Sequence, residues 1–351
     1  VDPPDPLDPG PALRRWITAT LRFPDGQLGF LPPAVGAALD PAHPPPDIVY
    51  TTGPPVTAHL TGLTLHALSG RPWIAEYRDP WLVDGAPCRP PALRCAWTDR
   101  CERWLEGRCL AAAAEVIAVS KGIAAEVAPR RAELGRPPPK VVLNGIPDLA
   151  PLGEPRRSGP RRILHLGNLY AFRDPRPFLE GLAALLAERS WGPTDIEVEM
   201  LGEPPAAPFR RFASSLGLDE VVRFTGWVDH ETGQDRLRRA DVLLLLAQGQ
   251  PLQIPNKLYE YLGSRRPILA FADPEGETAR MLRRAGGGVI LTGAEVPARI
   301  AAELSGLLDH GRDVAAGADL DVLEEWKTER QMRRLVGIVR GVPTRASNER
   351  T

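Results

Sequence analysis

The sequence lacks an excess of either charge. Its 43 lysines and arginines are balanced by 44 aspartates and glutamates, which leaves a formal net charge of -1. A near-neutral chain gives no support for wholesale binding to nucleic acid or to an anionic membrane surface. We therefore expect no nucleic-acid partner.

Two further absences limit the class of protein. No apolar run approaches the roughly 20 residues of a membrane-spanning helix, and no signal-peptide pattern is recognisable, so we expect a soluble, cytoplasmic protein. A basic amphipathic segment at residues 14–23 fits a peripheral contact with the inner membrane face, although an ordinary surface helix is the preferred interpretation. No C-x-x-C pair supports a zinc site, and we expect free thiols and no metal. The cysteines are Cys88, Cys95, Cys101 and Cys109.

The sequence contains enough hydrophobic residues to form two hydrophobic cores. At 351 residues and 43% hydrophobic residues, the chain exceeds what one core usually encloses, so two domains are expected. The 39 prolines and 33 glycines indicate many loops. We predict an N-terminal domain at 1–148, a linker at 149–161, a C-terminal domain at 162–318, and a C-terminal helix and tail at 319–351.

Apolar runs alternate with helical segments in both halves. Small and polar residues follow the runs, which predicts an α/β fold with open parallel sheets and a ligand crevice at the carboxyl ends of the strands. The strands expected in the first half are 47–51, 71–77, 114–119 and 140–143, and those in the second are 162–167, 196–201, 221–225, 241–246, 267–271 and 288–291.

The first half shows fewer strands than the second. Residues 1–12 are rich in proline and aspartate and are expected to be disordered. No Gly-rich turn precedes the strand at 47–51, and the chain begins with Val1 instead of methionine. We therefore expect an N-terminal domain without its first strand or strands, explained by a truncated or mis-assigned start or by a genuinely shorter domain.

The stretch from residue 240 to 270 predicts a strand, a polar loop, a helix and a second strand. Pro255 suits a helix start, so the helix is expected to begin at Pro255 or Asn256. Its free N–H groups favour an anion such as phosphate. Lys257 and Glu260 share one helix face. They form either a surface ion pair, which these residues alone favour, or a site in which Glu260 binds the ribose hydroxyls of a nucleotide.

Several blocks in order resemble the GT-B glycosyltransferases of family four, the retaining group often called glycosyl transferases group 1. They span residues 47 to about 291. The blocks are D-I-V-Y at 47–50, G-P-P at 53–55, A-H at 58–59, E-Y-R-D-P-W at 76–81, V-I-A-V-S-K-G at 116–122, N-G-I at 144–146, L-G-N-L-Y at 166–170, R-D-P-R-P at 173–177, F-T-G-W-V at 224–228 and P-x-K-x-Y-E-Y-L at 255–262.

The resemblance implies two facing Rossmann-like domains and a metal-independent hexosyltransferase of the kind found in polysaccharide biosynthesis. The sugar would move from a nucleotide-diphosphate sugar, the donor substrate, to a hydroxyl of a sugar, lipid or small-molecule acceptor, with no cofactor. A C-terminal helix at 320–339, with Trp326, would cross back to the first domain. The implied phosphate ligands are Arg173 and Lys257, and Glu260 is implied to bind the ribose. The other implied donor contacts are Gly167, Asn168, Gly226, Trp227, Pro255 and Asn256.

Two positions depart from the family pattern. Leu252 replaces the first glutamate of the E-x7-E motif, which leaves the donor sugar open. At the end of the first domain's central strand, Arg78 and Asp79 stand where many relatives carry a histidine. Asp79 would orient an acceptor hydroxyl and Arg78 would bind a phosphate; alternatively the two form a pair that pins the loop.

Three other functions are alternatives to a glycosyltransferase of this family. A dehydrogenase requires a G-x-G-x-x-G turn after a strand, whereas the glycines at 286–288 precede one, which excludes it. A GT-B sugar-nucleotide epimerase is disfavoured by the R-D-P-W block at 78–81. A non-catalytic glycosyltransferase-like subunit remains an alternative because of the missing N-terminal strand.

Overall fold

The structure is a computed structural model that describes residues 20, 23–44, 46–84, 86–88, 95–148, 159–169, 173–202 and 207–344. The chain splits into two compact units. The first comprises Val1–Leu143 with Met332–Thr351, and the second is Asn144–Gln331. The predicted disordered start, most of the basic segment at 14–23 and most of the linker at 149–161 lie outside the described residues.

The first unit contains a parallel sheet with the order β1-β2-β5-β6. All four strands predicted in this half are present. They are β1 (Val49–Gly53), β2 (Trp73–Tyr77), β5 (Glu115–Ala118) and β6 (Lys140–Val141). A separate antiparallel pair is formed by β3 (Leu82–Val83) and β4 (Ala86–Pro87). The helices are η1 (Leu28–Phe30), α2 (Leu31–Ala38), α3 (Val56–Ser69), α4 (Ala96–Ala112) and α5 (Lys121–Glu133).

The second unit contains a parallel sheet with the order β12-β11-β10-β7-β8-β9. Its strands are β7 (Arg161–Leu166), β8 (Ile196–Leu201), β9 (Val222–Gly226), β10 (Val242–Ala247), β11 (Ile268–Ala272) and β12 (Gly288–Leu291). All six predicted strands are therefore present, and the two parallel sheets confirm the predicted fold class. The strand order reverses beside β7, and doubly wound sheets bind ligands at the carboxyl ends of the strands where this happens.

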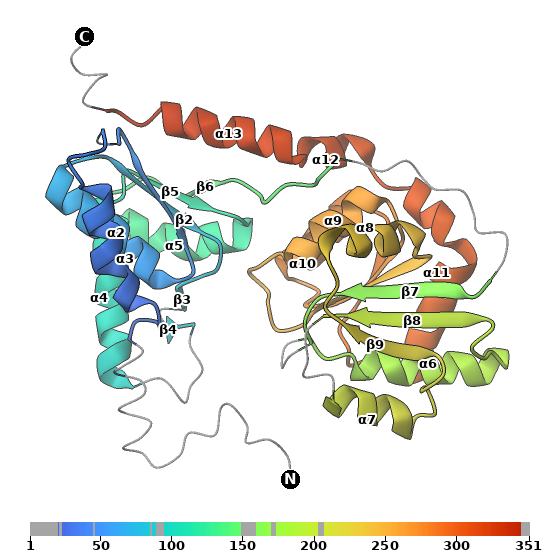
Figure 1. Ribbon diagram of the computed structural model, residues 1–351. Coiled ribbons are helices and arrows are strands. Elements are labelled where there is room, and N and C mark those ends of the chain that lie inside the picture. Colours follow the sequence, from blue (N-terminus) through green and yellow to red (C-terminus); the bar gives the residue numbers. More distant parts are fainter. Residues whose placement is uncertain are drawn as a thin grey trace. The chain divides into compact units, whose positions relative to one another are not determined.

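Helices cover both faces of the second sheet. Figure 1 shows α6 (Arg176–Arg189) and α7 (Ala207–Ser215) on one side, and α8 (His230–Arg239), α9 (Asn256–Ser264) and α10 (Glu277–Ala285) on the other. The core under α6 and α11 (Pro297–Ala316) is apolar and includes the fully buried Phe178, Leu244 and Leu304. Because β10 is buried on both faces, its sequence is a continuous apolar run instead of an alternating one.

The predicted C-terminal helix at 320–339 is wrong in one respect, because the structure has two helices there. They are α12 (Leu320–Glu325) and α13 (Thr328–Arg340). Between them Trp326 O accepts a hydrogen bond from Ile146 N (2.8 Å), and Thr328 N donates to Ile146 O (2.8 Å). Backbone groups used in this bridge are unavailable to a continuous helix. Further along, Ile338 lies in the core of the first unit.

None of the described helices combines the length and the apolar character that crossing a bilayer requires. Among the described residues, no three His, Cys, Asp or Glu side chains gather closely enough to hold a metal ion. All four cysteines are free.

Candidate functional site

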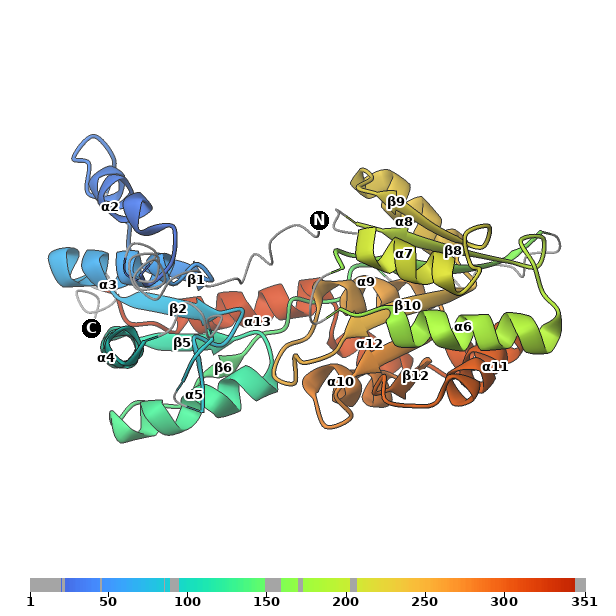
Figure 2. The same ribbon diagram turned by 90° about the horizontal axis from the view of Figure 1, so that it is seen from below.

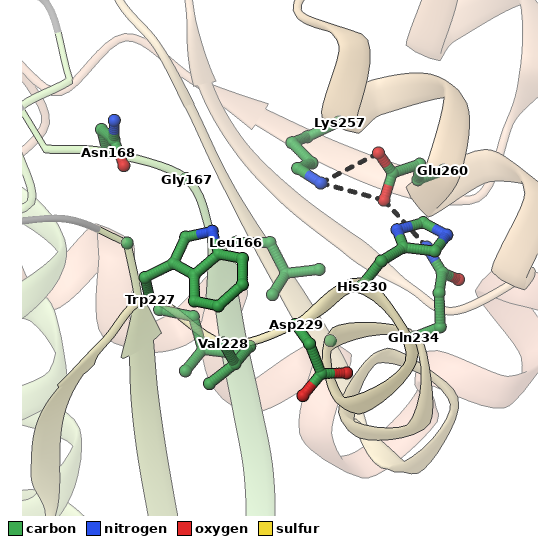
Figure 3. A pocket seen from close by; sticks show the side chains of 13 residues that line it. Leu166, Gly167, Asn168, Trp227, Val228, Asp229, His230, Gln234, Lys257 and Glu260 are labelled. Carbon is green, nitrogen blue, oxygen red and sulfur yellow. Dashed lines mark hydrogen bonds and ion pairs between the residues drawn. The ribbon is translucent and has the colours of Figure 1, made fainter.

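A pocket of about 190 Å³ lies at the carboxyl ends of β7 and β8 in the second unit (Figure 3). Three segments form its walls: the exits of the two strands, the loop after β9 with the first turns of α8, and the first turns of α9. The lining residues are Leu166, Gly167, Asn168, Leu201, Gly202, Trp227, Val228, Asp229, His230, Gly233, Gln234, Lys257 and Glu260.

Backbone forms the floor of this pocket. A Cβ atom on Gly202 would lie 2.2 Å from the Gly167 carbonyl oxygen, which is closer than any real contact. Gly167 N donates a hydrogen bond to Leu201 O (2.7 Å), which ties the two strand exits together. Only glycine at position 202 permits this approach. At Gly167 and Gly202 the floor therefore presents backbone, which suits close contact between backbone and a ligand.

The helix α9 begins at Asn256, with Pro255 as the preceding cap residue, within the predicted interval. Its first turn carries Lys257, whose Nζ lies 2.9 Å from Glu260 Oε1 and 3.1 Å from Oε2. Gln234 on α8 also donates to Glu260 Oε2 (3.0 Å), as Figure 3 shows. The side chains of Lys257 and Glu260 are 35% and 21% exposed. The pair is thus a half-buried i,i+3 ion pair on the wall of the pocket.

A buried hydrogen-bond network fixes α9 to the exit of β7. The Tyr261 hydroxyl accepts from Leu166 N (2.8 Å) and donates to Leu244 O (3.3 Å). His165 Nδ1 lies 2.9 Å from the same Leu244 oxygen and must donate to it, since a carbonyl only accepts. Burial lowers the pKa of His165 to about 4, so the ring is neutral at pH 7 and Nε2 carries the lone pair. The network connects the helix that carries Lys257 to the floor of the pocket.

Arg173 lies beside this floor. A Cβ atom on Gly167 would be 3.4 Å from Arg173 Nη1 and 3.6 Å from His165 Nε2. After burial, the positive charges of Arg173 and Lys257 are among the influences that lower the pKa of His165. The structure therefore brings two predicted phosphate ligands, Arg173 and Lys257, to the same strand exit as Gly167.

The opposite wall carries an exposed aromatic ring. The Trp227 side chain is 73% exposed and lines the pocket together with Leu166, and Figure 3 shows it across the pocket from the Lys257–Glu260 pair. Asp229 caps α8 by accepting from Thr232 N (2.9 Å). The cap stabilises the first turn of α8, whose His230 lines the pocket.

Other predicted site residues lie outside the pocket lining. Pro255 is buried as the cap of α9, and Asn256 Oδ1 accepts a hydrogen bond from Asn144 Nδ2 (2.8 Å). Gly226 ends β9, next to the lining residue Trp227.

The two acceptor-side candidates belong to the other unit. Arg78 and Asp79 are both exposed and follow β2 in the first unit, where Arg78 N donates to Gly53 O (2.8 Å). They are thus at the carboxyl end of a central parallel strand, the position expected for ligand-binding residues.

Comparison with known proteins gives the family. The sequence model described as "Glycosyl transferases group 1" matches residues 160–310, and the "Glycosyl transferase 4-like domain" matches residues 2–147. Together they cover most of the chain. The chain belongs to the group 1 glycosyltransferases. It is therefore a nucleotide-sugar glycosyltransferase with the GT-B fold.

Solved structures share the fold at low sequence identity. Anabaena Alr3699/HepE in complex with UDP is 14% identical, with a TM-score of 0.64 over 91% of this chain and 83% of that one. A glycosyltransferase from Rickettsia africae is 12% identical (TM-score 0.60, 95% and 82%). The α,α-trehalose 6-phosphate synthase of Burkholderia multivorans is also 12% identical (TM-score 0.63, 90% and 76%). No curated protein matches the glycosyltransferase.

Sequence reasoning missed several residues of this glycosyltransferase pocket. Gln234 and His230 gave no signal, because each is a single polar residue on a charged helix. Gly202 follows a strand exit, and a glycine in that position was a usable signal. His165 lies in a predicted strand and Tyr261 in a recognised block, but their contacts are to backbone atoms of distant segments.

Proposed function

We propose that this glycosyltransferase transfers a sugar from a nucleotide-diphosphate sugar to an acceptor hydroxyl with retention of configuration and without a metal ion. The observation that carries the proposal is the clustering of two cations at one glycine-floored strand exit. Arg173 Nη1 lies near Gly167, and Lys257 stands in the first turn of α9 above the same floor.

The diphosphate would lie over Gly167 and Asn168. Backbone N–H groups at a helix N-terminus favour negative charge, and Arg173 and Lys257 add two positive charges. Cleavage of the bond between sugar and phosphate builds negative charge on the leaving phosphate. Cations held in place before the reaction stabilise this charge without further reorganisation. In the retaining route, the departing phosphate oxygen takes the proton of the acceptor hydroxyl on the same face of the sugar.

The nucleoside would extend along the other walls. Glu260 would accept hydrogen bonds from the ribose hydroxyls, a role for which an ionised carboxylate is suited. Trp227, at 73% exposure, offers an aromatic face on which a base can stack. Gln234 already donates to Glu260 and would hold its carboxylate in place when Lys257 turns to the phosphate.

The acceptor would be a glycan, a lipid-linked sugar or a small molecule, as in polysaccharide biosynthesis. We assign Asp79 to orienting its hydroxyl and Arg78 to binding a phosphate on it. Both residues are exposed at the carboxyl end of β2. The assignment predicts that Asp79→Asn and Arg78→Gln raise KM for the acceptor and leave donor affinity unchanged.

Calorimetric titration of the full chain tests the donor site. UDP and UDP-glucose are the first probes, because HepE structures contain each of them, and a panel of other nucleotide sugars follows. We expect binding that weakens in Arg173→Ala and Lys257→Gln. The control is Arg238→Ala, which removes an exposed arginine from α8 outside the pocket lining.

Catalysis gives the second measurement. Once a donor and an acceptor are found, Arg173→Ala should lower kcat on the order of 10²-fold or more, the effect of removing a charge stabiliser. Unchanged turnover in a folded Arg173→Ala variant would overturn its role. Failure of every nucleotide sugar to bind would instead favour a non-catalytic subunit.

A further inference from the structure

The helix α4 of the first unit turns its arginines outward. Its three acidic residues, Asp99, Glu102 and Glu106, are half-buried or buried, and its three arginines, Arg100, Arg103 and Arg108, are exposed. At about 100° per residue the exposed residues fall within an arc of roughly 140°. The outward face of α4 is therefore basic, although the helix as a whole has equal numbers of acids and bases.

Structural contacts explain why Glu102 and Glu106 face inward. Glu102 Oε2 accepts a hydrogen bond from the indole N–H of Trp81 (3.0 Å), and both residues are buried. Glu106 pairs with Arg130 on α5, with Nε 2.8 Å from Oε2. Glu102 and Glu106 are thus directed to the interior, away from the exposed Arg100 and Arg108 on the outward face.

The same outward face carries two large aromatic side chains. Trp97 is 54% exposed and Trp104 is 64% exposed. On the helical wheel they lie next to each other, with Arg100 on one side and Arg108 on the other. The Phe23 ring, 5.6 Å from the Trp97 ring, extends the apolar surface. In Figure 2, where α4 is seen along its axis, α3 and α5 lie on either side of it.

We propose that this face of α4, defined by Trp97, Arg100, Arg103, Trp104 and Arg108, docks the enzyme on an anionic phospholipid bilayer. Tryptophan rings settle at the level of the lipid headgroups, because one edge is polar and the body is apolar. Arginines beside them attract anionic lipids and keep their charged ends in the headgroup layer. The inference is independent of the donor site in the second unit.

Other occupants of the α4 face fit less well. A second copy of the chain would bring three arginines against three arginines across a symmetric interface, which like charges oppose. A bilayer needs no matching shape, and so accommodates two protruding tryptophans without a complementary pocket.

Vesicle co-sedimentation of the full chain tests the proposal. We expect binding to vesicles of phosphatidylcholine with phosphatidylglycerol, weaker binding to phosphatidylcholine alone, and loss of binding as salt rises. The double variant Arg100→Gln/Arg108→Gln should bind anionic vesicles about 30-fold more weakly, at roughly fivefold for each charge. Trp97→Ser/Trp104→Ser should lose binding at low and at high salt alike.

Matched controls separate the α4 face from general surface charge. Arg211→Gln/Arg238→Gln removes two exposed arginines from α7 and α8, and Val296→Ser removes an exposed apolar side chain; both should bind as the wild type does. Brominated lipids should quench wild-type fluorescence, and Trp97→Phe/Trp104→Phe should abolish that quenching. Equal binding to neutral and anionic vesicles, or wild-type binding by the α4 variants, overturns the proposal. The proposal is also overturned if the wild type does not bind vesicles, and binding of a protein to this face in place of a bilayer would be one explanation of that result.

Discussion

Removing the Tyr261 hydroxyl should loosen the floor of the donor pocket. In Tyr261→Phe the Leu166 N–H loses its acceptor at 2.8 Å, while Leu244 O keeps the hydrogen bond from His165. A buried N–H without a partner costs about 1–3 kcal/mol. For a unit of this size each kcal/mol corresponds to about 2–4 °C, so the melting temperature should fall by about 2–12 °C.

The same change should weaken nucleotide binding. Tyr261 holds α9 to the exit of β7. In the variant, nucleotide binding would have to bring α9 and this strand exit back into position. If the whole cost of about 1–3 kcal/mol appears in binding, the Kd for UDP should rise about 5- to 150-fold. Calorimetry on the folded variant measures this change.

The matched control is Tyr77→Phe in the first unit, whose buried hydroxyl has no hydrogen-bond partner among the described residues. This variant should keep both the stability and the UDP affinity of the wild type. If Tyr261→Phe behaves in the same way as Tyr77→Phe, the network does not support the site.

Three further predictions concern the second unit and the reaction. Gly202→Ala should abolish UDP binding, because its Cβ would lie 2.2 Å from the Gly167 oxygen and would force the strand exits apart; Gly192→Ala, where the structure leaves open space, should bind normally. His165 becomes protonated below about pH 6.5 in the unfolded chain, but only near its pKa of about 4 in the folded chain. The free energy of unfolding therefore falls as the pH falls from 6.5 to 4. Denaturant unfolding should therefore show the stability gap between wild type and His165→Asn narrowing by about 3 kcal/mol from pH 7 to pH 4, and a constant gap would contradict a neutral buried ring. Turnover should be unaffected by EDTA, and a loss that magnesium or manganese restores would refute the metal-independent mechanism.

The strands and the start of α9 were predictable because their causes are local. The run from Val242 to Leu246 is apolar throughout, as a strand buried on both faces requires. Pro255 fixes where α9 begins, since its ring is compatible with the cap but its missing N–H would break a helix interior. Neighbouring residues were sufficient to reveal both features.

The contacts that shape the site were not predictable because their partners are far away in the sequence. The break between α12 and α13 depends on Ile146, which is 182 residues before Thr328. Tyr261 contacts Leu166, 95 residues earlier. The block pattern indicated that a tyrosine belongs at position 261, but only the folded chain shows that its hydroxyl joins a helix to a strand exit.

The ion pair between Lys257 and Glu260 that the sequence favours is present, and its geometry is also compatible with the donor site that we propose. A half-exposed i,i+3 pair contributes only about 0–1 kcal/mol, so little is lost when Lys257 exchanges a carboxylate for a diphosphate. Glu260 keeps the hydrogen bond from Gln234 when this happens. An ion pair that holds both side chains against the pocket wall is therefore compatible with the proposed donor site, and its presence does not argue against one.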